Sequence, residues 1–488
     1  MAGKTSHEKN ASWAGFDLST TGLGLGVRSS QGEEAYAAMK VRGATKWKGE
    51  PAFDLAHVPK MISTLLKKLQ REGWTFDKTV VSFAVRQHDM VLLDKQGELL
   101  MPALSWQCNA ASREVAALRT QGAEASVGRI EERFILPKLM WVLRQDAKLK
   151  SRVAQVMTTG DWITQCLTGK ASLSTSDAIS NGLLEQSNKR LAADVMKKAK
   201  LKPDWFPKVV QSGRVVGTIL AADKACDNDW AAVGEILGGG KVTAGLGDNH
   251  ATGVGCGLTE GDFRTMVISA GTSGTINRVC GAKDELAGNA ACFEYYRSRL
   301  LLMMLADCCK WYDRFVAKHA SKYKDRLDEL NTAALKADPT RLRRILHEGG
   351  KETYPPDWDK LSLGEKVASC QFSIMLELLL LIKSMQQEVA GGEATVDRFV
   401  LTGGLSQSQF FQQAFTAGVK VLQPKAKVLV SARSGPLRYQ TAAYGALLNA
   451  IRPTDSNAAD KLCASKACGS AKAADTKAIQ YLMRACGL

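Results

Sequence analysis

The sequence contains no apolar run long enough to cross a membrane. Stretches such as 300–306 (LLLMMLA) and 378–382 (LLLLI) fall far short of the ~20 residues that a spanning helix needs. The segment MAGKTSHEKN at the start is polar and lacks the apolar centre of a secretory signal. We therefore expect a soluble, cytoplasmic protein with no membrane partner.

Metal-binding and disulfide spacings are also missing. The twelve cysteines are scattered without a CxxC pair, and none of the six histidines is spaced against them as in a zinc site. A long chain with this pattern is expected to keep its cysteines reduced and structural.

The net charge of +16 would suit nucleic acid or phosphorylated small molecules as partners. However, the densest basic stretches, 138–152, 316–325 and 341–344, are short, lack interleaved aromatic residues and resemble solvated helix faces. No nucleic-acid-reading motif accompanies them, so we expect no nucleic-acid partner. Composition leaves open whether the protein is a monomer or a homodimer.

A length of 488 residues favours two domains of similar size. Strands are expected at 79–85, 241–244 and 397–401, and helices at 57–71, 363–390 and from about 406, with a short one at 478–486. Alternation of strands and helices in both halves predicts an α/β architecture with mixed sheets. Residues 15–30 and 267–280 share one strand–turn–strand plan, which suggests duplicated domains.

The first of these turns carries Ser19, Thr20, Thr21 and Gly22. Backbone N–H groups and hydroxyls in such a turn are the donors that a polyphosphate needs. Asp17, just before the turn, could hold Mg²⁺ through a water, or could simply cap the turn.

Two more turns have features of nucleotide binding. Gly271, Thr272 and Ser273 repeat the first turn in the second half. Gly403 and Gly404 follow a strand and precede a helix, so a flat ring could lie against bare backbone there. The glycines could equally well only join the strand to the helix.

Asp248 lies in the glycine-rich stretch GLGDNHATGVGCG, after a strand expected to end at Ala244 and before a helix expected to begin near Ala251. A carboxylate at this position could accept the proton of a substrate hydroxyl. It could also be the N-cap of the helix. The surrounding glycines would let the loop run close to a ligand without side-chain obstruction.

Taken together, these motifs resemble the FGGY family of carbohydrate kinases, and within it the xylulokinases. The resemblance covers roughly residues 12–450 and follows the family's order of motifs. These are DLSTTG, RQHDMVLLD, GDWITQCLTGKASLSTSDAISNGLLE, GDNHATGVG, SAGTSGTI and LTGGLSQSQFFQQ.

The resemblance implies two actin-like (ribonuclease H-like) domains with mixed sheets that flank a central cleft. Residues 1–258 would carry the sugar site, the first phosphate turn and the catalytic aspartate. Residues 259–488 would carry the second phosphate turn and the adenosine site, with a basic Ala/Lys-rich tail from about 453. ATP and Mg²⁺ are the implied cofactors, and the implied partners are ATP and a small sugar.

The implied reaction is phosphorylation of a small ketose, with D-xylulose converted to D-xylulose 5-phosphate. Asp248 would be the general base, and Ser408 would join the glycine pair at the adenosine. Implied sugar contacts are Gln87, His88, Trp106, Asp177 and Asn249. A kinase for ribulose, a seven-carbon ketose or a polyol, and a non-catalytic nucleotide-binding regulator, remain open alternatives.

The chain departs from the family pattern mainly at the sugar pocket. Arg86 stands in place of glutamine and Asp89 in place of glycine, while Gln107 and Cys108 replace Asn-Asp after Trp106. Gly24 occupies a position that is usually basic, and Ser19 one that is usually glycine. Asp89 would either narrow the choice of sugar or be a solvated turn residue.

Overall fold

The computed structural model describes residues 9–186, 189–348, 351–389, 396–431, 436–437, 440–464, 468–470 and 483. The chain forms two compact units. The first consists of residues up to Gly257, Cys292–Tyr296 and Ser434–Ser465. The second consists of Leu258–Ala291, Arg297–Arg433 and the residues from Lys466 onward.

The larger sheet of the first unit is mixed, as predicted. Its order is β14-β15-β8-β2-β3-β4, and the short β16 also pairs with β8. Strands β2, β3 and β4 form antiparallel pairs, β8 is parallel to β2 and β15, and β14 is antiparallel to β15. The strands are β2 (Trp13–Leu18), β3 (Gly22–Arg28), β4 (Glu34–Lys40), β8 (Val80–Val85), β14 (Val215–Thr218), β15 (Lys241–Thr243) and β16 (Leu246–Gly247).

The sheet of the second unit repeats this pairing in the order β20-β18-β17-β23-β24-β25. Read from β20, its pairs are antiparallel, antiparallel, parallel, parallel and antiparallel. The first sheet gives the same succession when it is read from β4 to β14. The strands are β17 (Thr265–Ala270), β18 (Gly274–Cys280), β20 (Ser298–Leu305), β23 (Arg398–Thr402), β24 (Lys427–Ser431) and β25 (Cys468–Ser470).

The predicted duplication therefore holds for strand pairing. Each unit places one hairpin turn between the end of its first strand and the start of its second, after Leu18 and before Gly22, and after Ala270 and before Gly274. These are the positions that the sequence aligns with each other.

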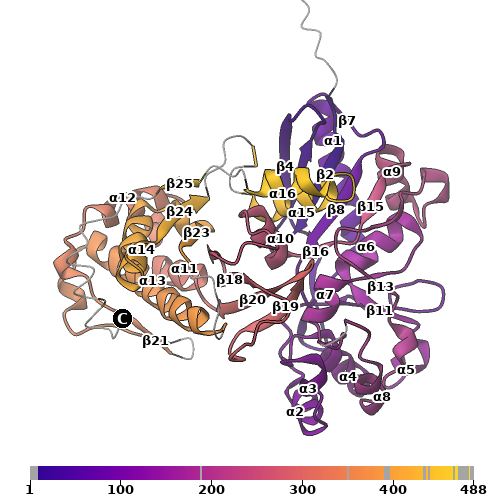
Figure 1. Ribbon diagram of the computed structural model, residues 1–488, viewed down its shortest axis with the longest axis horizontal. Helices are drawn as coiled ribbons and strands as arrows, with labels where there is room; N and C mark the ends of the chain where they lie inside the picture. The colour runs from indigo at the N-terminus through magenta and orange to yellow at the C-terminus, as the bar shows by residue number, and fades with distance from the viewer. Residues whose placement is uncertain are drawn as a thin grey trace, which may run out of the picture. The chain divides into compact units, whose positions relative to one another are not determined.

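A smaller sheet in the first unit has the order β11-β9-β10-β6-β5 and combines strands from before and after β8 in the chain. Helices of this unit cover both sheets (Figure 1). The small sheet consists of β5 (Ala44–Trp47), β6 (Glu50–Phe53), β9 (Met90–Leu93), β10 (Ala103–Leu104) and β11 (Gln155–Thr158). The helices include α1 (Val58–Arg71), α2 (Ser112–Thr120), α4 (Ile135–Gln145), α6 (Thr159–Thr168), α7 (Thr175–Ser180), α9 (Asn228–Leu237) and α10 (Asp248–Gly255).

Two late helices, α15 (Thr441–Ile451) and α16 (Ser456–Ala464), complete the first unit (Figure 1). Helix α15 packs on β2, β8 and α10, and glycines make this contact possible. A Cβ on Gly15 would lie 2.2 Å from the amide N of Leu447, and one on Gly255 would lie 1.8 Å from the carbonyl O of Thr441. A side chain at Gly15 would push α15 off the sheet, and one at Gly255 would push α15 away from α10.

The second unit is built around α13 (Leu363–Gln387), which begins at a capping box of Ser362 and Glu365. By length and composition alone α13 could cross a membrane, but 72% of its most apolar window is buried, as in the core helix of a folded domain. The other helices are α11 (Cys309–His319), α12 (Leu327–Leu335) and α14 (Gln409–Leu422).

Most expected elements are confirmed within a few residues, including α1, β8, β15, β23 and α13. The helix expected from about 406 is split into a 3₁₀ turn, Gly404–Gln407, and α14. The short helix expected at 478–486 lies outside the described residues apart from position 483.

Candidate active site

Three neighbouring strand ends bring the candidate residues of the first unit together. Val85 at the end of β8 pairs with Leu18 of β2 on one side and with Gly247 of β16 on the other. All three strands run in the same direction, so their next residues, Ser19, Arg86 and Asp248, follow one edge of the sheet. The carboxyl edge of parallel strands is where α/β folds usually bind ligands.

Asp248 is the first residue of α10, three residues earlier than the sequence predicted. The N-cap is Gly247, and no side chain makes a cap hydrogen bond. The Asp248 carboxylate instead accepts the N–H of Asn249 (2.8 Å) and a backbone hydrogen bond from Gln87. The structure thus contradicts the alternative that Asp248 serves as an N-cap.

Burial raises the pKa of Asp248 to about 6. The hydrogen bonds from Asn249 and Gln87 and the charge of Arg86 oppose the rise, whereas the charge of Asp89 adds to it. A carboxylate with this pKa is ionised at neutral pH and more basic than an ordinary aspartate. Both properties suit a general base.

The glycines around Asp248 allow close packing of neighbouring backbone and side chains. A Cβ on Gly245 would lie 2.6 Å from the Phe83 carbonyl O, and one on Gly247 would lie 2.3 Å from the Gln87 side chain. Together with the contact of Gly255 described above, these glycines allow β16 and α10 to pack closely on β8 and α15.

Asp17 is a second carboxylate near this edge. Its Oδ1 is buried and has no hydrogen-bond partner. Burial, and then the charge of Asp248, raise the pKa of Asp17 to about 7. A buried carboxylate oxygen without a partner is suited to a ligand that supplies positive charge.

The first phosphate turn is ordered by Ser19 and leaves its tip open. The Ser19 amide donates to the Gly22 carbonyl (2.9 Å), and the Ser19 hydroxyl accepts from the Gly22 amide (3.1 Å). Thr20 and Thr21 are exposed. Trp106 donates its indole N–H to the Thr20 hydroxyl (3.1 Å), so a predicted sugar contact lies against a predicted phosphate contact.

The segment after β8 carries two predicted sugar contacts whose side chains form hydrogen bonds with other side chains of the protein. Gln87 Nε2 lies 2.9 Å from His250 Nδ1, and His88 Nδ1 lies 3.1 Å from Asn181 Oδ1. His88 has a φ of 71°, in the left-handed region, and its ring stacks on Phe134. Burial and nearby cations hold the pKa of His88 well below its usual value, so its ring is neutral.

The two other predicted sugar contacts differ in exposure. Asn249 is half-buried next to Asp248. Asp177 is 1% exposed, and its Oδ2 accepts from the Ser174 hydroxyl (3.3 Å) while Oδ1 has no hydrogen-bond partner. Burial, and then the charge of Asp161, raise the pKa of Asp177 well above its ordinary value.

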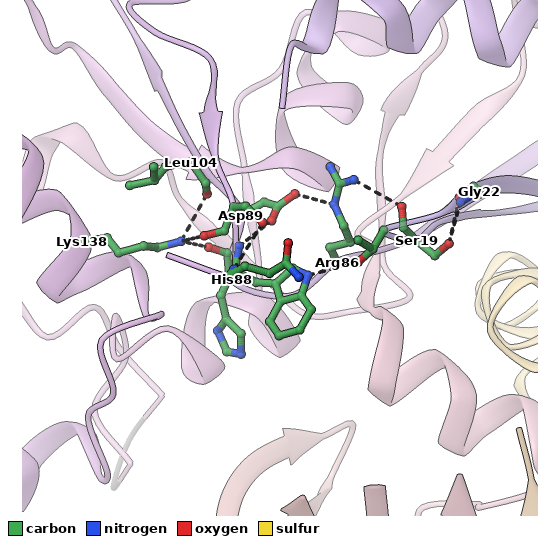
Figure 2. A network of polar contacts seen from close by, with 11 residues as sticks. Ser19, Gly22, Arg86, His88, Asp89, Leu104 and Lys138 are labelled. Atoms are coloured by element: carbon green, nitrogen blue, oxygen red, sulfur yellow. Dashed lines mark hydrogen bonds and ion pairs between the residues drawn. The ribbon is translucent and has the colours of Figure 1, made fainter. Parts of the chain in front are cut away.

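Figure 2 shows a polar network that the sequence did not reveal. Arg86 Nε donates to Asp89 Oδ2 (2.6 Å), and Asp89 Oδ1 accepts from the Trp106 amide (2.9 Å). The buried ammonium of Lys138 donates to the carbonyls of His88, Leu104 and Ser105. Burial lowers the pKa of Lys138 to about 8.

Asp89 is therefore neither the solvated turn residue nor the free acceptor at the pocket rim that the sequence allowed. Its side chain is fully buried, and both oxygens are bound by groups of the protein. A sequence signal for this network existed: Arg86 directly follows an apolar strand, and Lys138 lies within the apolar helix ILPKLMWVL. Charges at such positions are rarely fully buried unless they are paired.

The second unit brings its glycine motifs together in the same way. β17 and β23 are parallel neighbours, and Gly403, with φ 93°, lies against the end of β17. A Cβ on Gly403 would be 2.5 Å from the carbonyl carbon of Ala270, whereas one on Gly404 would be 3.5 Å from Cys309 Sγ. Gly403 is thus required by backbone packing, and only Gly404 has room for a side chain.

The remaining predicted nucleotide contacts in this unit are placed differently from one another. Gly271 and Ser273 are half-buried and Thr272 is exposed, as a ligand-binding turn would need. Ser408 is 1% exposed and caps α14. Its hydroxyl donates to Gln371 Oε1 (2.7 Å) and accepts from the Phe411 amide (3.4 Å). A role for Ser408 at the adenosine stays a prediction.

Comparison with known proteins gives a family and a fold. The model of the FGGY family of carbohydrate kinases, N-terminal domain, matches residues 13–255. Xylulose kinase of Escherichia coli (strain K12) is 27% identical over 312 residues, which cover 61% of this chain and 62% of that protein.

Solved structures show the same fold over nearly the whole chain. A xylulose kinase from Lactobacillus acidophilus superposes with a TM-score of 0.80 at 16% identity, covering 98% of this chain and 96% of that one. A gluconate kinase from the same organism also gives 0.80 at 16% identity, covering 97% and 96%. The predicted two-domain actin-like fold is confirmed at the level of architecture.

Proposed function

Because the chain belongs to the FGGY family of carbohydrate kinases, we propose that it transfers the γ-phosphoryl group of ATP to a hydroxyl of a small ketose. D-xylulose is the proposed substrate and D-xylulose 5-phosphate the product. The observation that carries the proposal is the Asp248 carboxylate, which has no capping role and a pKa of about 6. A phosphate-type turn follows β2, which lies on the other side of β8 from Asp248.

In the proposed step, the sugar hydroxyl oxygen attacks the γ-phosphorus as its proton passes to the Asp248 carboxylate. The new O–P bond forms while the bond from the γ-phosphorus to the bridging oxygen of ADP breaks. The backbone and hydroxyls of residues 19–22 would hold phosphate oxygens. Asp248 then returns its proton to water.

The residues present fit a Mg²⁺ ion bound through the nucleotide. Mg²⁺ keeps several waters and usually takes one or two carboxylates together with substrate phosphates. Asp17 offers a buried carboxylate oxygen without a partner, and no cluster of three or more acidic, histidine or cysteine side chains in the described part of the chain offers a closed cage instead. Mg²⁺ held at Asp17 would neutralise charge on the phosphates.

The sugar would bind where neutral groups converge. His88 is held neutral, and Gln87 and Asn249 are uncharged, so this wall can exchange hydrogen bonds with hydroxyl groups. Trp106 would supply apolar contact, and the buried Asp177 would lie behind this wall. We infer that the acceptor is an uncharged polyhydroxylated molecule.

In the second unit, the turn at Gly271, Thr272 and Ser273 is proposed to bind phosphate, and the Gly403–Gly404 pair to lie against the adenosine. Support comes from their adjacency at the end of β17 and from the repeated hairpin geometry.

The test is ADP release, measured by a coupled assay, over D-xylulose, D-ribulose, a seven-carbon ketose, several polyols and gluconate. We expect the highest kcat/KM for D-xylulose and little turnover of the anionic gluconate. Asp248→Asn serves as the blank for background hydrolysis. Turnover of another sugar alone would replace the substrate, and ADP release that no acceptor increases would contradict a kinase and favour a nucleotide-binding regulator.

A further inference from the structure

Two departures from the family pattern form a buried ion pair with each other. Arg86 stands where the pattern has glutamine and Asp89 where it has glycine. Their side chains are 5% and 0% exposed, and Arg86 Nε lies 2.6 Å from Asp89 Oδ2. Either substitution alone would destabilise the fold, because a buried charge without a partner is strongly unfavourable.

Arg86 is held rigidly on several sides. Its Nη1 donates to the Ser19 carbonyl O (3.2 Å), and its guanidinium carbon lies 4.3 Å from the centroid of the Phe53 ring. Asp89 is itself fixed through the Trp106 amide. As Figure 2 shows, Arg86 therefore spans from the sugar-binding segment to the phosphate turn.

One nitrogen of this guanidinium has no partner. Arg86 Nη2 is buried and makes no hydrogen bond, although Arg86 as a whole is 4% exposed. Buried cationic donors are usually satisfied, so a donor that is held in place without a protein partner is suited to bind a ligand. The ligand must accept hydrogen bonds and should be an anion.

The location of Arg86 identifies which anion. Val85 pairs with Leu18 and Gly247, so Arg86 is flanked by the phosphate turn at Ser19 and by the proposed base Asp248. Its charge also acts on Asp248. In phosphoryl transfer, the group between the phosphate donors and the base is the γ-phosphoryl group itself.

A third departure supports this assignment. The pattern has a basic residue at position 24, but here the residue is Gly24, and a Cβ on it would lie 2.4 Å from the Tyr36 hydroxyl. Tyr36 is fixed by a hydrogen bond to Gln440 (3.0 Å). A long cation cannot occupy position 24 while Tyr36 stays in place, so a positive charge for the phosphates has to come from elsewhere.

We propose that Arg86 Nη2 binds the γ-phosphoryl group during transfer and takes over the charge that is absent at Gly24. This inference rests on the proposed kinase function. As the bond between the γ-phosphorus and the bridging oxygen breaks and the bond to the sugar oxygen forms, Arg86 stabilises the negative charge on the equatorial oxygens. Asp89 is a positioning residue that aims the guanidinium.

The variants separate charge from stability. Arg86→Gln restores the family residue but leaves Asp89 buried without its partner, so Arg86→Gln/Asp89→Gly is the key variant, because it removes both charges. Arg28→Gln is the matched control: Arg28 also forms a shielded ion pair on the same sheet, with Glu34, but makes no contact with the phosphate turn. Circular dichroism and melting curves verify folding.

We expect the double variant to lose roughly 10²–10³-fold in kcat while the KM for sugar stays within a few-fold. Calorimetry should show that the preference for the non-hydrolysable ATP analogue AMP-PNP over ADP, which reports contact with the γ group, falls about 10-fold or more. Arg86→Lys should recover only part of the rate, because a single ammonium cannot reproduce the fixed directions in which the planar guanidinium reaches Asp89, the Ser19 carbonyl and the γ-phosphoryl group. Arg28→Gln should match the parent in both measurements.

A folded double variant with parental kcat and an unchanged preference for AMP-PNP would overturn the inference. So would a variant whose only defect is a raised KM for gluconate, because Arg86 would then bind a substrate carboxylate. If the parent enzyme phosphorylates no acceptor, the proposed function has failed, and the AMP-PNP to ADP ratio still decides whether Arg86 contacts a γ-phosphate.

Discussion

Asp248→Asn should abolish most turnover without weakening the fold. The substitution keeps the size of the side chain and one oxygen that can accept the Asn249 amide, which lies 2.8 Å from Oδ1 in the parent. It removes the basicity that the sugar proton needs. Loss of a general base costs roughly 10²–10⁴-fold in rate, with nucleotide affinity nearly unchanged.

The structure also fixes the expected sign of the stability change. Burial raises the pKa of Asp248 from 3.8 to about 6, so the folded state binds its proton more tightly than the unfolded state. Stability from this group is full below pH 3.8 and is lost as the pH rises to about 6. Above that, the buried charge costs at most about 3 kcal/mol, at 1.36 kcal/mol for each pKa unit.

Asparagine carries no such charge. At pH 8 the variant should therefore melt at the same temperature as the parent or a few degrees higher, and the difference should vanish below about pH 4. If Asp248 were only an N-cap, the swap would leave both rate and stability nearly unchanged, because asparagine and aspartate cap helices about equally well.

The assays are coupled ADP release over a range of sugar concentrations, which gives kcat and kcat/KM, and thermal melting, each measured from pH 4 to pH 9. The parent's kcat/KM should rise tenfold per pH unit up to a limb near pH 6, where Asp248 ionises. Near-parental turnover of the variant, or a clear drop in its melting temperature at pH 8, would refute our reasoning about this carboxylate.

Three further substitutions test other parts of the site. Gly404→Val should raise the Kd for ATP at least several-fold and leave sugar affinity unchanged, as measured by calorimetry. Equal ATP affinity would exclude an adenine ring at this backbone. Gly403→Val would be uninformative, because its Cβ would meet the Ala270 backbone. Asp17→Asn should raise the Mg²⁺ concentration needed for half-maximal rate about 10-fold or more, and an unchanged requirement would place the metal elsewhere. Lys138→Met should lower the melting temperature by several degrees and raise the KM for sugar but not for ATP. The reason is that the ammonium donates to the carbonyls of His88, Leu104 and Ser105. A parental melting curve would argue that these buried hydrogen bonds do not stabilise the fold.

Local patterns in the sequence carried much of the architecture. Apolar runs such as the one in β8 (Val80–Val85) and the capped, apolar α13 are local features, because periodicity and end signals are written in adjacent residues. The repeated hairpins at Leu18–Gly22 and Ala270–Gly274 were visible for the same reason. Asp248 was found from the motif around it. A role as a helix cap could not be excluded from the sequence, because the first residue of a helix cannot be placed accurately from sequence alone.

The sequence by itself therefore predicted an α/β chain with two similar hairpins, the candidate base and the candidate phosphate turns. Tertiary structure alone decided that Arg86 and Asp89 are partners, that Lys138 ties together the loops around His88, and that the segment containing α15 belongs to the first unit. These contacts depend on burial and on residues distant in the chain, and a charged residue looks the same in sequence whether it is solvated or paired. What packs against the glycines near Asp248 was likewise visible only in the tertiary structure, and at Gly255 it is the backbone at the start of α15.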